Sequence, residues 1–158
     1  MKFNPIAFVI NLAIPLAAGA IGSILTLTSV KTWYPTLAKP SFNPPDSIFP
    51  PVWTCIFILM GVSAYLVWQK REQIAHFPRM IAVYAIQILL NMMWSFLFFY
   101  AKNLGAALFE VVFLLIVIVI NGTMFYKIDK TAGLLFIPYF LWVCFATALT
   151  YSIFSLNG

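Results

Sequence analysis

The chain has 158 residues, of which 63% are hydrophobic and only 8% are charged. A typical soluble domain is about half apolar and a quarter charged, so this composition excludes a water-soluble fold. The net charge of +5 comes from nine lysine and arginine residues that are spread along the chain, with no basic cluster interleaved with aromatic residues. The composition therefore predicts a polytopic membrane protein, and no nucleic acid is expected as a partner.

Breaks in the apolar sequence predict five membrane-spanning helices in a single domain over residues 1–158. Each segment has the 20 or so residues needed to cross a hydrocarbon core about 30 Å thick. Because lipid offers the backbone no hydrogen-bond partners, each segment must be helical, which gives an all-α integral membrane bundle. The expected spans are residues 5–29, 48–68, 78–100, 104–126 and 131–156, and residues 30–47 form the first loop.

The first span allows a second interpretation. Lys2, the apolar run and the small residues Ala18-Gly19-Ala20 are similar to a signal peptide with its cleavage site. The apolar run continues to Leu27, however, which is longer than the hydrophobic region of a typical signal peptide. We therefore expect a retained spanning helix.

The stretch from Trp33 to Trp53, WYPTLAKPSFNPPDSIFPPVW, is the most unusual part of the chain. It holds six of the ten prolines, each of which fixes φ and lacks an N–H donor. A helix through its middle is therefore excluded. The stretch also carries five aromatic residues, which a solvated linker would not need. We expect residues 30–47 to form a stiff lid that closes a ligand cavity.

Lysine and arginine are distributed unequally between the two sides of the membrane. Cytoplasmic loops carry an excess of these residues, so the distribution predicts a cytoplasmic N-terminus and places the lid on the far side. The N-terminal side holds Lys2, Lys70, Arg71, Arg79, Lys127 and Lys130, whereas the other side holds Lys31, Lys39 and Lys102.

Polar residues at bilayer depth are costly and usually face a cavity or a partner helix. In the third span Gln87, Asn91 and Ser95 recur every four residues, on one stripe of the helix and next to Trp94. Hydrogen bonding between helices explains such a stripe without any ligand. For Gln87 and Ser95 both interpretations remain open, whereas Asn91 beside Trp94 favours a ligand site.

Glu110 lies about two turns into the fourth span without a basic partner nearby. We interpret it as structural, because a helix N-terminus favours a carboxylate, and a proton relay is the alternative. Cys55 and Cys144 lie in apolar runs and are expected to be buried free thiols. Since His76 is the only histidine and no Cys/His cluster exists, no metal site is expected.

Aromatic and small residues follow the second and fifth spans at helical spacing. These stripes indicate either packing or the wall of a wide apolar pocket under the lid, which a large flat hydrophobic ligand would require. Small residues in the first span, at Ala18 with Gly22 and Gly19 with Ser23, favour close helix contact within the bundle or in a dimer. The stripes are Trp53 with Phe57 and Pro138 with Trp142, Ala146 and Leu149.

Three ordered signatures resemble the translocator protein family, also called tryptophan-rich sensory proteins or peripheral-type benzodiazepine receptors. The resemblance covers nearly the whole chain. The signatures are Trp33-Tyr34 with Lys39-Pro40, Asn43-Pro44-Pro45, Phe49-Pro50 and Trp53; then Asn91 with Trp94 and Phe98-Phe99; then Pro138-Tyr139, Trp142, Phe145-Ala146-Thr147 and Leu149.

The resemblance implies a five-helix bundle, usually a homodimer, in a bacterial cell membrane, with a ligand cavity closed by the first loop. Family members bind tetrapyrroles such as protoporphyrin IX and haem, isoquinoline carboxamide or benzodiazepine-type drugs and, in animals, cholesterol. A tetrapyrrole would be a ligand rather than a required cofactor. By position, the resemblance implies a binding site of Tyr34, Pro44, Phe49, Trp53, Phe57, Asn91, Trp94, Trp142, Ala146 and Leu149.

The resemblance implies a receptor or sensor that binds tetrapyrroles without turnover. The alternatives are a light-dependent porphyrin-degrading enzyme, with Trp53 and Trp142 as candidate catalytic residues, and a transporter of tetrapyrrole or lipid. Two positions depart from the family pattern: Tyr151 lacks the following arginine of the cholesterol-recognition pattern, and Phe42 stands where bacterial members often have tryptophan. No nucleophile–base pair or phosphate loop supports hydrolysis or phosphoryl transfer.

Overall fold

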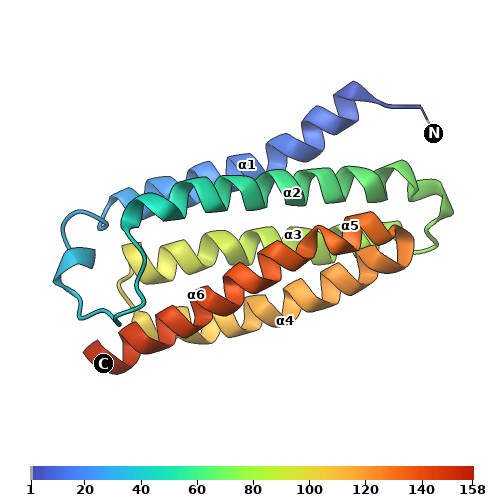
Figure 1. The fold of residues 1–158 in the computed structure, drawn as a ribbon. Helices are drawn as coiled ribbons and strands as arrows, with labels where there is room; N and C mark the ends of the chain where they lie inside the picture. The colour runs from blue at the N-terminus through green and yellow to red at the C-terminus, as the bar shows by residue number, and fades with distance from the viewer. Residues whose placement is uncertain (1) are drawn as a thin grey trace.

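The computed structural model describes residues 2–158, and within this range it contains helices and connecting segments but no β-strand (Figure 1). The helices lie alongside one another in an elongated bundle. A π-helical segment, Phe96–Tyr100, continues α3, and short 3₁₀ turns cover Tyr34–Thr36, Asp46–Ile48 and Arg71–Gln73. The α-helices are α1 (Pro5–Leu27), α2 (Phe49–Gln69), α3 (Phe77–Ser95), α4 (Leu104–Ile128), α5 (Lys130–Leu134) and α6 (Phe136–Asn157).

Within residues 2–158, five helical segments are long and apolar enough to cross a membrane, which confirms the predicted all-α fold with five spans. The expected fifth span is divided at Leu135 into α5 and α6. Pro138 lacks the N–H that would bond the carbonyl of Leu134, so the helix is interrupted just before it. The segments are Pro5–Leu27, Asp46–Gln69, Phe77–Tyr100, Leu104–Ile128 and Lys130–Asn157.

Local signals in the sequence set where the helices begin. Asn4 caps α1, because its side-chain Oδ1 accepts a hydrogen bond from the Ala7 N–H at 3.0 Å. Asn103 caps α4 in the same way through the Ala106 N–H, also at 3.0 Å. Proline occupies the first turn of α1, α2 and α3, where the missing N–H has no helical partner to lose.

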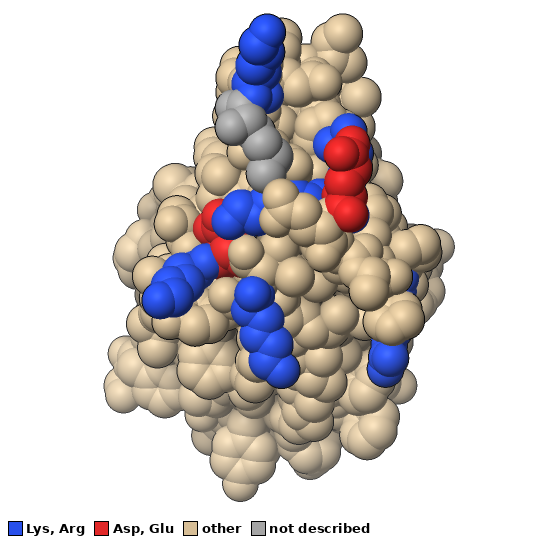
Figure 2. Space-filling model, turned by 90° about the vertical axis from the view of Figure 1, so that its right-hand side faces the viewer, with Lys and Arg blue, Asp and Glu red and all other residues tan. Residues whose placement is uncertain are grey.

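The two ends of the bundle differ. We call the end with residues 30–47 and the C-terminus the lid end, and the end with residues 70–76 and 127–130 the charged end. Figure 2 looks at the charged end and shows several lysine and arginine side chains gathered around few acidic ones. In Figure 1 the lid end is on the left and the charged end on the right.

Among residues 2–158, the buried apolar side chains form two clusters. The larger cluster joins α1 to α6, and its most buried members include Met60, Leu114 and Tyr139. The smaller cluster lies beneath the lid and consists of Tyr34, Phe98, Phe99, Ala107, Leu149 and Ile153. Many large apolar side chains on the outer helix faces are exposed, as expected for helices surrounded by lipid.

The structure tests two expectations, the burial of the cysteines and the contacts of the small residues in the first span. Cys55 is exposed on α2, so its predicted burial was wrong, because an apolar run in a spanning helix faces lipid as well as protein. Gly19 and Gly22 pack within the chain, the first against the Phe57 ring and the second against Ser95. A Cβ on Gly61 would lie 2.8 Å from the Leu12 Cα, so glycine lets α1 and α2 approach closely.

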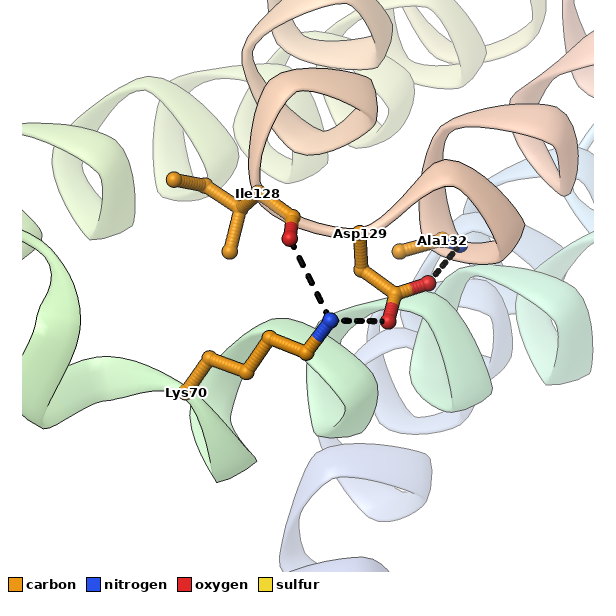
Figure 3. A network of polar contacts seen from close by, with 4 residues as sticks. All are labelled: Lys70, Ile128, Asp129 and Ala132. Carbon is orange, nitrogen blue, oxygen red and sulfur yellow. Dashed lines mark hydrogen bonds and ion pairs between the residues drawn. The ribbon is translucent and has the colours of Figure 1, made fainter.

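At the charged end a polar network joins α2 to the junction of α4 and α5 (Figure 3). Lys70 Nζ donates to Asp129 Oδ2 at 2.7 Å and to the Ile128 carbonyl at 3.3 Å. Asp129 Oδ1 accepts from the Ala132 N–H at 2.9 Å, which caps α5. The hydrogen bond from Lys70 lowers the pKa of the Asp129 carboxyl. About two turns before Lys70, Ser63 Oγ donates to the Ala132 carbonyl at 2.7 Å.

Candidate functional site

The lid is anchored on the end of α3. Tyr34 is only 5% exposed, and its ring centroid lies 6.1 Å from that of Phe98 and 5.6 Å from that of Phe99. Its hydroxyl donates to Asn43 Oδ1 at 3.1 Å. Burial, with a smaller contribution from the nearby negative charge of Asp46, raises the pKa of Tyr34 to about 12. Tyr34 therefore keeps its proton and acts as an apolar wedge with one hydrogen bond.

The lid is also fastened to the far end of α6. The Ala38 N–H donates to Asn157 Oδ1 at 2.9 Å, and Asn157 Nδ2 donates to the Ala38 carbonyl at 2.8 Å. Ser29 Oγ, at the beginning of the lid region, donates to the Phe99 carbonyl at 2.5 Å. Phe42 packs edge-on against Phe145, with ring centroids 6.2 Å apart. The lid is thus bonded to both α3 and α6.

A small interior pocket lies beneath the lid. Its volume is about 10 Å³, roughly the space of one water molecule. Four of the residues that the sequence predicted for the site line it: Trp53 on α2, Asn91 and Trp94 on α3, and Ala146 on α6. The pocket is completed by three apolar residues that were not predicted, Val111, Leu114 and Val143.

The pocket wall carries two polar side chains. Asn91 Nδ2 donates to the Tyr139 hydroxyl, so this hydrogen bond joins α3 to α6. Trp94 Nε1 is buried and has no hydrogen-bond partner among residues 2–158. A buried N–H without a partner is uncommon in proteins and marks a place where a ligand or water would gain a hydrogen bond. Two of the residues that line the pocket thus carry hydrogen-bonding groups.

The polar stripe of α3 divides between two roles. Asn121 Nδ2 on α4 donates to Gln87 Oε1 at 2.9 Å, and both residues are fully buried. Gln87 is therefore used for bonding between helices, one of the two interpretations left open by the sequence. Ser95 packs against Gly22 of α1. Only Asn91, with its neighbour Trp94, reaches the interior pocket.

The other predicted site residues do not line the pocket. Trp142 lines a separate apolar groove on the outside of the bundle. The Phe49 ring contacts the Trp142 ring, with centroids 5.8 Å apart. Phe57 stacks on Trp53 at 5.6 Å, and Leu149 belongs to the cluster beneath the lid. Pro44 lies within the lid, where its carbonyl accepts from Asn43 Nδ2 at 3.3 Å.

The outer groove lies between α2 and α6. It has a volume of about 520 Å³, far larger than the interior pocket. Its surface is almost entirely apolar. The groove is lined by Pro51, Val52, Cys55, Ile56 and Leu59 of α2 and by Pro138, Leu141 and Trp142 of α6.

Glu110 is a buried residue whose setting the sequence did not predict. It is 6% exposed, and neither carboxyl oxygen has a hydrogen-bond partner within residues 2–158. It lies on the inward face of α4, one turn from both Ala107 and Leu114. Its helical position could have indicated burial, because Leu114 and Asn121 share its face. In the described part of the chain, no group of three or more histidine, cysteine or acidic residues could hold a metal ion.

Comparison with known proteins gives one consistent result. Residues 11–156 match the TspO/MBR family. The chain is 42% identical over 146 residues to the tryptophan-rich protein TspO of Chlorobaculum tepidum, with 90% of each chain covered. It is 36% identical over 155 residues to the protein of the same name from Archaeoglobus fulgidus (98% and 99% covered) and 31% identical over 147 residues to the translocator protein of Sus scrofa (91% and 86% covered). With five helical segments in its described part that are long and apolar enough to span a membrane, this integral multi-pass membrane protein belongs to the TspO/MBR family.

Proposed function

We propose that this protein is a membrane receptor or sensor that binds tetrapyrroles, such as protoporphyrin IX and haem, and related hydrophobic ligands inside the helix bundle. Membership of the TspO/MBR family supports a membrane sensor or receptor role in general. The observation that carries the tetrapyrrole proposal is the convergence of Trp53, Asn91, Trp94 and Ala146, from three helices, on one pocket under a closed lid.

The chemistry of this pocket suits a flat apolar ligand. The rings of Trp53 and Trp94 offer faces on which a macrocycle can stack, and apolar side chains of α4 and α6 surround its edges. Trp94 Nε1 and Asn91 supply the few polar groups that fix orientation. Pockets for ligands of drug size have volumes of about 300–1,000 Å³, so binding requires the helices around the 10 Å³ pocket to separate.

A light-dependent porphyrin-degrading enzyme is the second candidate function. One observation favours it: Trp53 and Trp142, the candidate catalytic residues, lie on two adjoining helices, one at the interior pocket and the other at the outer groove. Phe49 contacts Trp142, and Trp53 contacts Tyr139 with ring centroids 6.5 Å apart. In this mechanism Trp53 at the pocket and Trp142 at the groove would relay electrons or radicals.

The other partners follow from the family rather than from this geometry. Isoquinoline carboxamide or benzodiazepine-type drugs would occupy the same pocket, and membrane lipid would surround the outer helix faces. A homodimer would use the exposed apolar surface of the bundle. The basic residues at the charged end favour a cytoplasmic N-terminus in a bacterial cell membrane, with the lid on the opposite side (Figure 2).

One experiment separates binding from turnover. Purified protein is mixed with protoporphyrin IX and followed optically in light and in the dark, beside Trp53→Phe and Trp142→Phe. The receptor function predicts altered porphyrin bands or fluorescence quenching without a new product. A product that forms only in light and only with both tryptophans would instead establish the enzyme. The absence of any spectral change would show that both functions are wrong.

A further inference from the structure

The interior pocket and the outer groove lie on opposite sides of one wall, the contact between α2 and α6. On α2, Trp53 lines the pocket whereas the preceding residue, Val52, lines the groove. On α6, Val143 lines the pocket whereas the preceding residue, Trp142, lines the groove. Since adjacent residues of each helix face the two spaces, only the contact between α2 and α6 separates the pocket from the groove. A movement of a few side chains and a small separation of the helices would connect them.

Among the described residues, polar contacts hold α2 in place at the charged end but not at the lid end. At the charged end, α2 is joined to the α4–α5 junction by the Lys70–Asp129 ion pair and to α5 by the Ser63 hydrogen bond to Ala132. Toward the lid end, α2 and α6 meet through aromatic contacts such as that of Phe49 with Trp142. Within residues 2–158, no side-chain hydrogen bond or ion pair links α2 to α6.

The fifth span has a joint next to this wall. Its helix is interrupted at Leu135, because Pro138, one turn before Trp142, lacks the N–H that would bond the Leu134 carbonyl. Helices bend preferentially at such positions. Figure 1 shows α6 running obliquely relative to α2. Bending at this joint would move the part of α6 that carries Trp142 while α5 stays attached to α2.

The alternative route, through the lid, is more strongly bonded. The lid carries the paired hydrogen bonds between Ala38 and Asn157, and Tyr34 is wedged against Phe98 and Phe99. The groove, in contrast, extends from Pro51 to Leu59, about 12 Å along the axis of a spanning helix. It therefore faces the hydrocarbon of the bilayer, where an apolar ligand is already dissolved.

We propose that the groove between α2 and α6 is a lateral portal, through which an apolar ligand dissolved in the bilayer passes into the interior pocket. Phe49 and Trp142 form its gate, and a lipid acyl chain occupies the groove when no ligand passes. The identity of the passing ligand rests on the proposed function. The access of acyl chains to Trp142 does not.

The first test concerns acyl chains alone. Tryptophan fluorescence is compared in nanodiscs of phosphatidylcholine with brominated or ordinary acyl chains, because bromine quenches tryptophan on contact. The Trp142 share of the fluorescence is the emission of the unmodified protein minus that of Trp142→Phe. The matched control is the Trp94 share, obtained in the same way with Trp94→Phe. The portal predicts that bromine quenches the Trp142 share more strongly than the share of Trp94, which is also half-buried but lines the interior pocket. An unquenched Trp142 share would overturn the proposal.

The second test locks each route in turn. In a Cys144→Ser background, Leu141→Cys is bridged to the native Cys55 across the groove with a bifunctional thiol reagent. The matched control bridges Ala38→Cys to Asn157→Cys across the lid, with Cys55 and Cys144 replaced by serine. The rate at which protoporphyrin IX from the bilayer associates is measured before and after bridging.

The portal predicts that the bridge across the groove slows association by about tenfold or more, whereas the bridge across the lid leaves the rate unchanged. The reverse pattern would show that ligand passes through the lid and would overturn the proposal. If the unbridged protein does not bind protoporphyrin IX, the proposed function is wrong, and the bromine experiment alone decides whether the groove admits acyl chains.

Discussion

Asn157 and Ala38, 119 residues apart in the sequence, exchange two hydrogen bonds of 2.9 and 2.8 Å. The side-chain amide of Asn157 accepts from and donates to the same backbone unit, so it holds the lid against the end of α6. The pair is solvent-exposed, which places each hydrogen bond at the low end of the usual range of about 0.5–1.5 kcal/mol.

Replacing Asn157 by alanine is expected to loosen the lid. The loss of both hydrogen bonds should lower the free energy of unfolding by about 1 kcal/mol. Amide hydrogen exchange within residues 37–43 should accelerate, while exchange in α4 stays unchanged. Asn157→Asp keeps the acceptor for the Ala38 N–H but loses the donor, so its lid should exchange at an intermediate rate. Equal exchange in all three proteins would contradict the role of this pair.

The Asp129 carboxyl combines an ion pair with a helix cap, and two substitutions separate them. Asp129→Asn keeps a side chain that caps well and loses the charge, which should cost less than about 1 kcal/mol because Lys70 is partly exposed. Asp129→Ala loses the cap as well and should cost about 1 kcal/mol more. Thermal unfolding in detergent measures both. An Asp129→Asn protein as unstable as Asp129→Ala would show that the charge matters more than the cap.

Asp129 also makes the stability of the folded protein depend on pH. The pKa of Asp129 is lowered in the folded protein, so its contribution to stability is present above the ordinary aspartate pKa of about 3.9. This contribution is lost as the pH falls through the lower pKa of the folded state. The melting temperature of the unmodified protein should therefore fall toward that of Asp129→Asn at acid pH. If the melting temperatures of the unmodified protein and Asp129→Asn differed by the same amount down to acid pH, the stabilising role of the Asp129 charge would be refuted.

Gly61 provides a test of the close contact between α1 and α2. Gly61→Ala places a Cβ 2.8 Å from the backbone Cα of Leu12, which cannot move aside like the end of a side chain. Overpacking of this kind costs about 1–3 kcal/mol. The matched control is Gly105→Ala, where the new Cβ would meet Phe154 Cε2 at an ordinary 3.4 Å. Thermal unfolding should separate the two variants, and similar melting temperatures would contradict the packing of α1 on α2.

Substitutions of Glu110 test whether its buried carboxyl, which has no hydrogen-bond partner within residues 2–158, lowers the stability of the protein. Because neither oxygen is hydrogen-bonded, Glu110→Leu should raise the free energy of unfolding by about 1–3 kcal/mol. Glu110→Gln keeps a buried polar group and should gain little. A less stable Glu110→Leu protein would show that the carboxyl has a structural partner. Both variants should be measured without added ligand.

The features that depend on local sequence were predictable. Five spans follow from the length of each apolar run, and the prolines between Trp33 and Trp53 exclude a helix through the lid. The polar stripe of the third span, with Trp94 next to it, favoured a ligand site at Asn91, and both residues line the pocket.

The features that depend on how helices are rotated and paired were not predictable. Trp142 shares a helix with Ala146 and was expected beside it, but it lines the outer groove. The bond between Ala38 and Asn157 joins residues whose proximity no local pattern encodes. Val111 and Leu114 resemble every other apolar residue of α4, so nothing in the sequence marks them as pocket residues.

The most direct test of tetrapyrrole binding in the interior pocket is the equilibrium affinity for protoporphyrin IX in nanodiscs, measured in the dark. Trp53→Ala is compared with Trp68→Ala, which removes a tryptophan that stacks on Tyr65 near the charged end, outside the pocket. We predict that Trp53→Ala weakens binding by roughly 1–3 kcal/mol, the scale of a lost stacking contact, while Trp68→Ala binds as the unmodified protein does. An unchanged affinity in Trp53→Ala would contradict binding in this pocket.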